Sequence, residues 1–312
     1  MKVKKIHIYL LVATISFVGN KVFAQTEPMY SQYMYNMLGI NSAYAGNREA
    51  TSFNFYQRNQ WVGLAGAPKT TSISVDGAFK DKNLGWGLQL YDDRLGVEKA
   101  DGMNMMLATH IQVSENGILS GGLNMGLMNY RIDLLNVQDR YTPNDPAFYS
   151  NFNKWLPSLG LGIYYNTNQF YAGLSIPNAL KSRLTALDII RSGLQKLNST
   201  HIFFTTGYVF NINSDVKIKP STLIKAVEGA PLEADLNTNV WLRDMIGLGF
   251  SYRTGDAMVA MAELQFNENL RIGYAYDITI SPLKYYNNGS HELLFRYEVG
   301  KNRSKVKSTR YF

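Results

Sequence analysis

The chain has 312 residues and no cysteine, which excludes disulfide bonds, thiolate metal sites, thiol nucleophiles and a lipidated N-terminal cysteine. Its formal net charge of +7 comes from the two ends: four lysines lie in residues 1–24 and five basic residues lie in residues 301–312, and neither segment has an acidic residue. The body between them is slightly acidic, so a nucleic-acid-binding face is not expected.

Residues 1–24 have the pattern of a cleavable export signal. Lysines come first, an apolar stretch runs from Ile6 to Val18, and Val22-Phe23-Ala24 has the form of a signal-peptidase site. We predict that the mature chain begins at Gln25. The apolar stretch is too short for a membrane-spanning helix, and no other run reaches about 18 apolar residues, so a helical membrane protein is not expected.

Residues 25–49 come next and form a separate N-terminal segment. They are rich in Tyr, Met and Asn, and they show no sustained period of 2 or 3.6 residues. No regular strand or helix is therefore predicted for this segment.

Fourteen segments between residues 50 and 300 alternate apolar and polar side chains, each near the 9 to 11 residues that cross a bilayer in a tilted strand. Near residue 250, for example, Ile246, Leu248 and Phe250 share one face, while Ser251 and Arg253 share the other. The predicted strands are residues 50–60, 70–79, 83–91, 100–113, 117–131, 156–166, 168–176, 199–212, 215–226, 231–242, 244–254, 256–266, 268–279 and 289–299. Pro220 cannot donate to a ladder, so a bulge or a strand end is expected there.

Together with the export signal, this pattern predicts an all-β fold, an antiparallel transmembrane outer-membrane β-barrel of about 14 strands formed by residues 50–300. A soluble sandwich also alternates, but the export signal and the turns favour the barrel. Strand ends read from sequence vary by two to four residues, so twelve or sixteen strands remain compatible with the pattern. An even number puts both termini on one side, which we predict to be the periplasm.

The connections between the predicted strands are of two kinds. Short polar turns follow the second, fourth, sixth, eighth and twelfth strands and are assigned to the periplasmic side. The two longest connections, residues 132–155 and 177–198, have the opposite parity and are assigned to the outer side. The basic tail, residues 301–312, is read as a solvated segment, with a docking peptide as the alternative.

A lumen of fourteen strands is too wide for wall side chains alone to fill. Either residues 25–49, which are periplasmic or lumen-entering, or the 132–155 loop is expected to enter it. The charged residues assigned to the lumen have both signs, which suits a paired interior better than an ion-selective ring. The predicted lumen charge network is Arg253, Glu263, Arg271, Asp277, Arg296 and Glu298, and Lys217, Lys219 and Glu292 also face inward.

An enzyme, a metal protein and a nucleotide-binding protein are weakly supported. His110, His201 and His291 are the histidines left after signal removal, and no spacing around them marks a catalytic triad. The glycines of Gly85-Trp86-Gly87 and Gly160-Leu161-Gly162 indicate close backbone approach or a bend in the wall rather than a phosphate loop. No cofactor is predicted. A calcium site is the less favoured reading of one acidic loop, which contains Asp133, Asn136, Asp139, Asn144 and Asp145.

Several stretches resemble the PorP/SprF family of outer-membrane proteins of the type IX secretion system. They are YSQYMYNMLGINSAYAG (30–46), FYAGLSIPNAL (170–180), KPSTLIK (219–225), SYRTGDA (251–257), RIGYAYD (271–277) and NNGSHELL (287–294). The resemblance extends over essentially the whole mature chain. In the first stretch, Met37 and Ser42 stand where the family usually has prolines.

The resemblance implies a fourteen-stranded barrel without catalysis that serves protein export, cell-surface anchoring and gliding motility. The implied partners are the type IX ring lipoprotein and its partner protein, for a core component, or a secreted surface protein with a type B C-terminal domain, for a dedicated helper; the sequence does not separate these roles. Motif positions that the resemblance places in possible partner contact are Tyr30, Gln32, Tyr33, Asn36, Tyr44 and Gly46. The alternatives are a porin or transporter for a small solute and, third, an enzyme.

Overall fold

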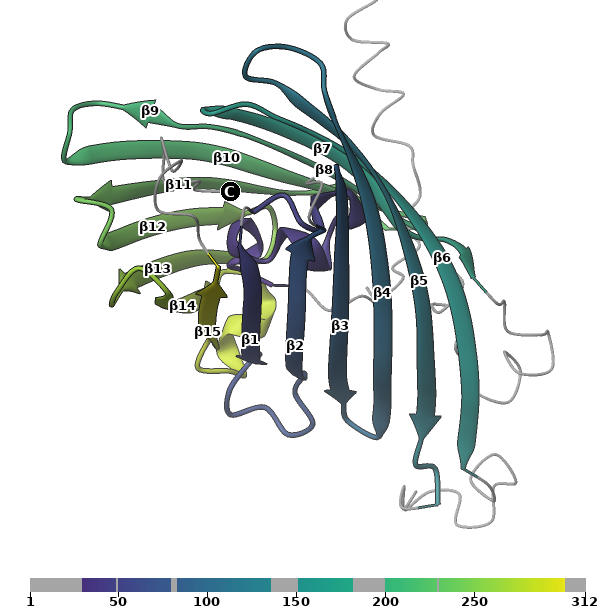
Figure 1. The fold of residues 1–312 in the computed structure, drawn as a ribbon. Coiled ribbons are helices and arrows are strands. Elements are labelled where there is room, and N and C mark those ends of the chain that lie inside the picture. Colours follow the sequence, from purple (N-terminus) through teal and green to yellow (C-terminus); the bar gives the residue numbers. More distant parts are fainter. Residues whose placement is uncertain are drawn as a thin grey trace, which may run out of the picture.

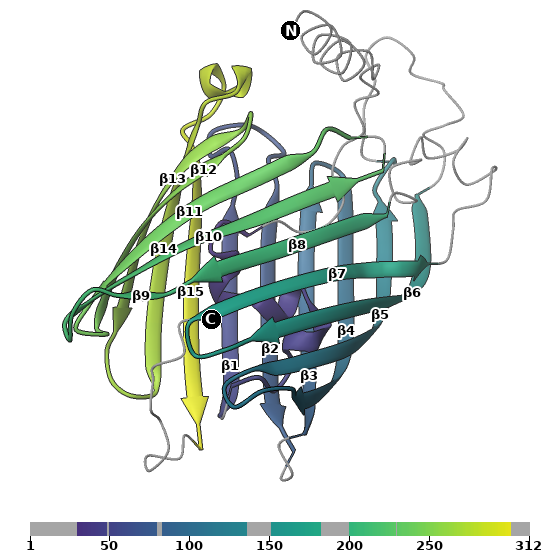
Figure 2. The same cartoon turned by 90° about the horizontal axis from the view of Figure 1, so that it is seen from above.

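The computed structural model describes residues 30–48, 50–79, 83–135, 151–181, 200–228 and 230–300, which form a closed antiparallel β-barrel (Figures 1 and 2). Each strand pairs with its neighbours in the chain, and β1 pairs with β15 to close the barrel. The strands are β1 (Thr51–Asn59), β2 (Lys69–Ala78), β3 (Leu84–Leu95), β4 (Glu98–Gln112), β5 (Ile118–Ile132), β6 (Phe152–Asn166), β7 (Phe170–Lys181), β8 (His201–Tyr208), β9 (Phe210–Asn211), β10 (Val216–Val227), β11 (Glu233–Leu242), β12 (Ile246–Arg253), β13 (Ala257–Gln265), β14 (Leu270–Thr279) and β15 (Ser290–Val299).

The strand β9 continues β8 in the same register against β10, so the barrel has fourteen strands and the predicted fold is confirmed. The alternation explains why these segments form a barrel. On β12, Leu248 and Phe250 are each 54% exposed on the outer face, while Ser251 and Arg253 are buried on the inner face. Apolar side chains thus point outward, where lipid would surround them, and polar side chains line the lumen.

The two ends of the barrel differ. We call the end where β1 begins and β15 ends the terminal rim, since Thr51 pairs there with Val299. We call the opposite end, where β5 leads toward β6 and β7 toward β8, the loop rim. The terminal rim has tight turns, such as that from Gln112 to Ile118, as expected from the sequence.

The N-terminal segment lies inside the barrel (purple in Figure 1). It forms three short 3-10 turns, η1 (Tyr33–Tyr35), η2 (Met37–Gly39) and η3 (Ser42–Tyr44), whose short length explains why the sequence showed no periodicity. None of the helices in the described part of the chain is long and apolar enough to cross a membrane. The main buried core is therefore the contact between this segment and the inner wall.

Three strand predictions need correction. The strand predicted from residue 156 begins at Phe152, the strand predicted to end at 91 continues to Leu95, and the strand predicted to end at 176 continues to Lys181. These errors arise because the strands continue past the length that a bilayer requires. Pro220 does not end β10, which pairs with β11 through it; instead the pairing between β10 and β8 is interrupted beside it, near Tyr208, since proline has no N–H to donate.

Candidate functional site in the barrel lumen

Residues 30–48, which we call the plug, pass through the lumen and are clamped at both ends by charged wall residues. Near the loop rim, Arg58 of β1 binds Asp277 at 2.7 Å and Glu292 at 3.1 Å. Arg253 of β12 binds Asp235 at 3.0 Å and reaches Asp277 at 3.4 Å. All five side chains are buried, so each charge depends on these partners.

The start of the plug completes this loop-rim cluster. The Ser31 hydroxyl accepts from Arg58 at 2.8 Å and donates to the Asp277 carboxylate at 2.8 Å. The backbone N–H groups of Ser31 and Gln32 donate to the two carboxylate oxygens of Glu292, each at 2.8 Å. The plug therefore supplies donors that two buried wall carboxylates would otherwise lack.

At the terminal rim the plug ends in a second cluster. Arg48 binds Glu298 of β15 at 2.5 Å and donates to the Tyr44 hydroxyl at 3.0 Å. The N–H of Gly46 donates to Asp76 of β2 at 3.2 Å. Six residues of β15 separate Glu298 from Glu292, so the two clusters hold the plug at points about 20 Å apart along one strand.

Between the clusters, tyrosine hydroxyls join the plug to amides on β11. Asn237 donates to the Tyr33 hydroxyl at 2.6 Å, and Asn239 donates to the Tyr35 hydroxyl at 3.2 Å. Burial raises the pKa of both phenols well above the usual value, which keeps them neutral. Arg296 of β15 donates to the Tyr35 carbonyl. The middle of the plug is thus held by neutral groups and one arginine.

The opposite wall meets the plug by close backbone approach. A Cβ on Gly122 of β5 would lie 2.1 Å from the Ala43 nitrogen, so only glycine fits at that position. Gly46 has a φ of +71°, and a Cβ there would lie 2.6 Å from the Gly85 Cα of β3. The predicted close approach near Gly85 is therefore an approach of the plug, not of a ligand.

Two side chains fix this contact in place. His110 of β4 contacts the Ser120 hydroxyl at 2.8 Å and the Ala45 carbonyl at 3.0 Å. Asn41 in the plug donates to the Ile163 carbonyl of β6 at 2.9 Å. His110 therefore orients the plug, a role that no motif in the sequence indicates.

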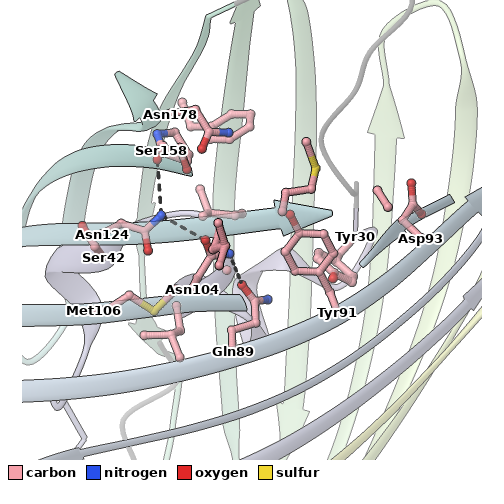
Figure 3. Close-up of a pocket in the computed structure, with 18 of the residues that line it drawn as sticks. Tyr30, Ser42, Gln89, Tyr91, Asp93, Asn104, Met106, Asn124, Ser158 and Asn178 are labelled. Carbon is pink, nitrogen blue, oxygen red and sulfur yellow. Dashed lines mark hydrogen bonds between the residues drawn. The ribbon is translucent and has the colours of Figure 1, made fainter. Parts of the chain in front are cut away.

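A chamber lies between the plug and the inner face of β3 to β8 and β10 (Figure 3). Its floor includes Leu38, Ile40 and Ser42 of the plug. Amides cross its wall in a row: Asn104 donates to Gln89 at 3.3 Å, and Asn124 donates to Asn104 at 3.3 Å. Asn124 also donates to the Pro177 carbonyl at 3.3 Å. Apart from Asp93 and Lys225 this lining is neutral, unlike the charged wall on the other side of the plug.

The motif positions are all placed in the plug. Tyr30, Gln32, Tyr33, Asn36, Tyr44 and Gly46 are all buried inside the barrel. Their contacts in the structure are with the barrel's own wall or within the plug: Tyr30 packs against Tyr56 with ring centroids 5.4 Å apart, and the Asn36 N–H donates to the Tyr33 carbonyl at 2.9 Å. Contact with a partner remains a prediction for them.

The six residues of the predicted charge network are buried on the lumen side, but the structure does not bring them together as one network. Arg253 and Asp277 belong to the loop-rim cluster. Glu263 and Arg271 form a separate pair at 2.8 Å. Arg296 and Glu298 lie in the half of the lumen nearer the terminal rim, where both bind the plug.

Sequence reasoning missed several residues of these clusters. Arg58 follows Asn54 and Tyr56 at period 2 on β1, so alternation alone would have placed it in the lumen. Asp235 had the same signal on β11. Ser31 and Arg48 had none, because their roles depend on how the plug folds back through the barrel.

The other histidines and the acidic loop that the sequence analysis considered are not brought together as a site in the described residues. His201 is buried on the lumen face, and His291 contacts the Tyr274 hydroxyl at 2.5 Å on the outer face. Within the described ranges, no three His, Asp or Glu side chains gather as a metal site would require. Four residues of the acidic loop lie outside the described residues: Asn136, Asp139, Asn144 and Asp145.

Comparison with known proteins gives one match over most of the chain. The model of the family described as type IX secretion system membrane protein PorP/SprF matches residues 22–297. No curated protein matches.

Among solved structures, the chain is similar to several proteins at 9–10% identity. The toluene transporter TbuX of Ralstonia pickettii is 10% identical, with a TM-score of 0.49 over 90% of this chain and 96% of that one. The outer membrane protein Omp33 of Acinetobacter baumannii is 9% identical, with a TM-score of 0.46 over 80% and 99%. The translocator domain of autotransporter NalP from Neisseria meningitidis is 10% identical, with a TM-score of 0.44 over 86% and 95%. We draw nothing about function from such distant similarities.

Proposed function

Because this chain belongs to the PorP/SprF family of type IX secretion system membrane proteins, we propose that it is a non-enzymatic outer-membrane barrel that supports secretion or cell-surface anchoring of proteins through protein contacts. The observation that carries the proposal is the plug. Residues 30–48 close the lumen and are held there by a wall cluster that includes Arg58, Glu292 and Glu298. A closed lumen suits a barrel that docks partner proteins better than one that passes solutes.

Two sets of partners fit the family, and each gives the barrel a different role in type IX export. As a core component it would contact the ring lipoprotein and its partner protein from the periplasm. As a dedicated helper it would receive one secreted protein that has a type B C-terminal domain. Deletion of the gene separates them, since a core component is needed for all type IX export and a helper for the display of one surface protein.

The absence of catalysis is part of the proposal. The contact between His110 and Ser120 supports it, because Ser120 is fully buried and the second ring nitrogen of His110 is engaged by the Ala45 carbonyl. A serine nucleophile would need access to substrate, and this hydroxyl has none.

We further propose that the terminal rim faces the periplasm, so that the basic residues 301–312 lie where ring or cell-wall contact occurs. Deleting residues 301–312 and still recovering the ring complex would remove that contact from the proposal. The position of the N-terminus is a separate question, because Ser31 lies in the half of the lumen nearer the loop rim, bonded to Asp277 and Glu292. The periplasmic position of the N-terminus therefore does not follow from that of the terminal rim. Labelling of a cysteine placed at residue 25 would decide it.

Conductance is the direct test of the closed lumen. The purified barrel in a planar bilayer should show no stable open-channel current at ordinary salt, whereas a porin or transporter with a water-filled lumen should conduct. A steady open current from the intact chain would move the proposal to a small-solute channel.

A further inference from the structure

Three neighbouring strands change the polarity of their outer face along one line near the loop rim. On the outer face the apolar residues end at Leu90 of β3, Met103 of β4 and Leu127 of β5, which pair with one another in that order. On β6 the exposed Trp155 lies just beyond this line, beside Asn129. A boundary that follows paired residues across three strands marks the level at which the lipid-facing band ends.

Beyond this line the outer face is charged. Asp92 binds Arg94 at 2.7 Å and Lys99 at 3.0 Å, and Asp101 binds Lys99 at 3.3 Å and also Arg131. Such a row of ion pairs belongs in water, not in hydrocarbon. We call this part of the sheet, residues 91–102, 128–132 and 152–156, the hood.

The inner face of the hood has an apolar cluster, which lies beside charged residues such as Asp93 and Glu98. Tyr130, Ile132 and Leu156 are each about 5% exposed and form a second hydrophobic cluster. Ala100, Met128, Leu134 and Phe152 pack against it. Ala100, Met128 and Leu156 also line the chamber, so the cluster is part of the wall of the same space.

Below the hood the chamber offers neutral hydrogen-bonding groups. The row of Gln89, Asn104 and Asn124 presents amides, and Ser158 adds a hydroxyl (Figure 3). Asn124 is only 5% exposed, and its Oδ1 has no hydrogen-bond partner among the described residues. A buried acceptor without a donor is costly, so a ligand that donates there would be favoured.

Both charged side chains in the chamber lining have polar partners on the wall. Asp93 accepts from the Thr70 hydroxyl at 2.5 Å, and Lys225 binds Glu233 at 2.6 Å. The lining therefore suits a neutral ligand. Amides present donors and acceptors together, as peptide groups do, and the methionines Met106 and Met128 are flexible enough to pack against varied apolar side chains.

We propose that the chamber and the hood bind an uncharged, extended segment of a secreted polypeptide, with its peptide groups on the amide row and its apolar side chains against the hood. This inference rests on the proposed function, and it names the site at which a client protein is held. The plug forms the floor, so the segment enters from the loop rim and stops in the lumen without crossing it.

The test uses the absence of cysteine from the chain. Ser158→Cys places a thiol in the chamber, and Asn153→Cys places a matched thiol on the exposed outer face of the hood. Both variants, purified in detergent, are treated with a small maleimide with and without a purified type B C-terminal domain from a protein displayed by the same cells. We expect the domain to slow labelling at Ser158→Cys at least about tenfold and to leave Asn153→Cys unchanged.

A second measurement follows the client in cells. The double variant Asn104→Leu with Asn124→Leu should reduce the surface-retained client about tenfold, since two peptide-group hydrogen bonds are lost. Asn153→Leu is the control and should retain the client. Equal barrel levels in the outer membrane show that the variants fold.

The outcomes separate this inference from the function it rests on. If gene deletion abolishes display while the double variant displays normally and the domain leaves labelling of Ser158→Cys unchanged, the chamber is not the binding site and the proposed function stands. If gene deletion leaves all display and secretion intact, the proposed function itself fails. Protection by a neutral oligosaccharide such as maltoheptaose, and not by the domain, would overturn the inference in favour of a sugar site.

Discussion

The two halves of the lumen wall hold the plug by different means. The half made of β10 to β15 and β1 is charged and grips the plug through buried arginines and carboxylates, such as Arg58 and Glu292. The half made of β3 to β7 is mostly neutral, meets the plug through glycines such as Gly122, and leaves a chamber above it. The charged wall holds the plug through ion pairs, whereas the neutral wall packs against it and leaves the chamber open.

Physical chemistry explains why these tasks are divided. A buried ion pair is strongly destabilised when one partner is removed, so the charged wall resists loss of the plug. A neutral wall of amides and methyl groups has no such penalty and accepts an exchange of water for ligand.

Removing the plug should have the largest effect. Deletion of residues 30–48 leaves the charges of Arg58, Asp277 and Glu292 facing a water-filled lumen, so stepwise open-channel currents should appear in planar bilayers where the intact chain has none. A deletion variant that inserts normally but stays closed would show that another part of the chain occludes the barrel.

Breaking the charged grip should come next. Arg58→Met removes the shared partner of Asp277 and Glu292 and should lower the free energy of unfolding by about 3–5 kcal/mol, measured by denaturant titration in detergent. Arg94→Met is the matched control, because its pair with Asp92 lies on the exposed face of the hood, and it should change stability by less than about 1 kcal/mol. Equal losses from both variants would contradict the special role of the buried cluster.

The neutral wall should respond to added volume rather than to lost charge. Gly122→Ala would place a methyl group within 2.4 Å of the backbone of Ser42 and Ala43, and it should cost about 1–3 kcal/mol. Gly121→Ala, one residue away on the outer face, meets nothing nearer than Thr109 at 3.8 Å and should be neutral. Increased ion leakage in Gly122→Ala alone would show that the methyl group displaces the plug.

The smallest effect should come from the middle of the plug. Tyr33→Phe removes the hydroxyl that accepts from Asn237 at 2.6 Å and should cost about 1 kcal/mol. The Asn237 amide also lies near the Ser221 carbonyl at 3.5 Å, which limits the loss. Tyr297→Phe, on the half-exposed outer face, is the comparison and should be near zero. A loss in Tyr33→Phe as large as that of Arg58→Met would place the main grip in the middle.

Much of the barrel was predictable from residue alternation, because one buried face and one lipid face impose period 2 on every strand. The inward position of Arg253 and the outward position of Leu248 followed directly. The plug was harder to predict, since 3-10 turns leave no period, and Asp277 and Glu292, which bind Ser31, lie more than 200 residues away in the chain.

The hood was missed for a different reason. The sequence was read with the bilayer thickness as the length of each strand, so β6 was expected to start at residue 156. Beyond the bilayer, the polarity of the two faces of β5 reverses, as Arg131 outside and Tyr130 inside illustrate. If this reversal is allowed, the alternation pattern predicts longer strands with apolar residues on their inner face.

The order of the plug and the strands in the chain has a consequence for biogenesis. Residues 30–48 precede β1, yet Glu292 and Glu298, which bind them, belong to β15, the last strand to be made. Since the pairing of β1 with β15 closes the barrel, residues 30–48 must already lie inside the sheet when these two strands pair. Insertion of this protein therefore couples seam closure to the capture of its own N-terminal residues, and a sheet that closed too early would enclose an empty, hydrated cylinder.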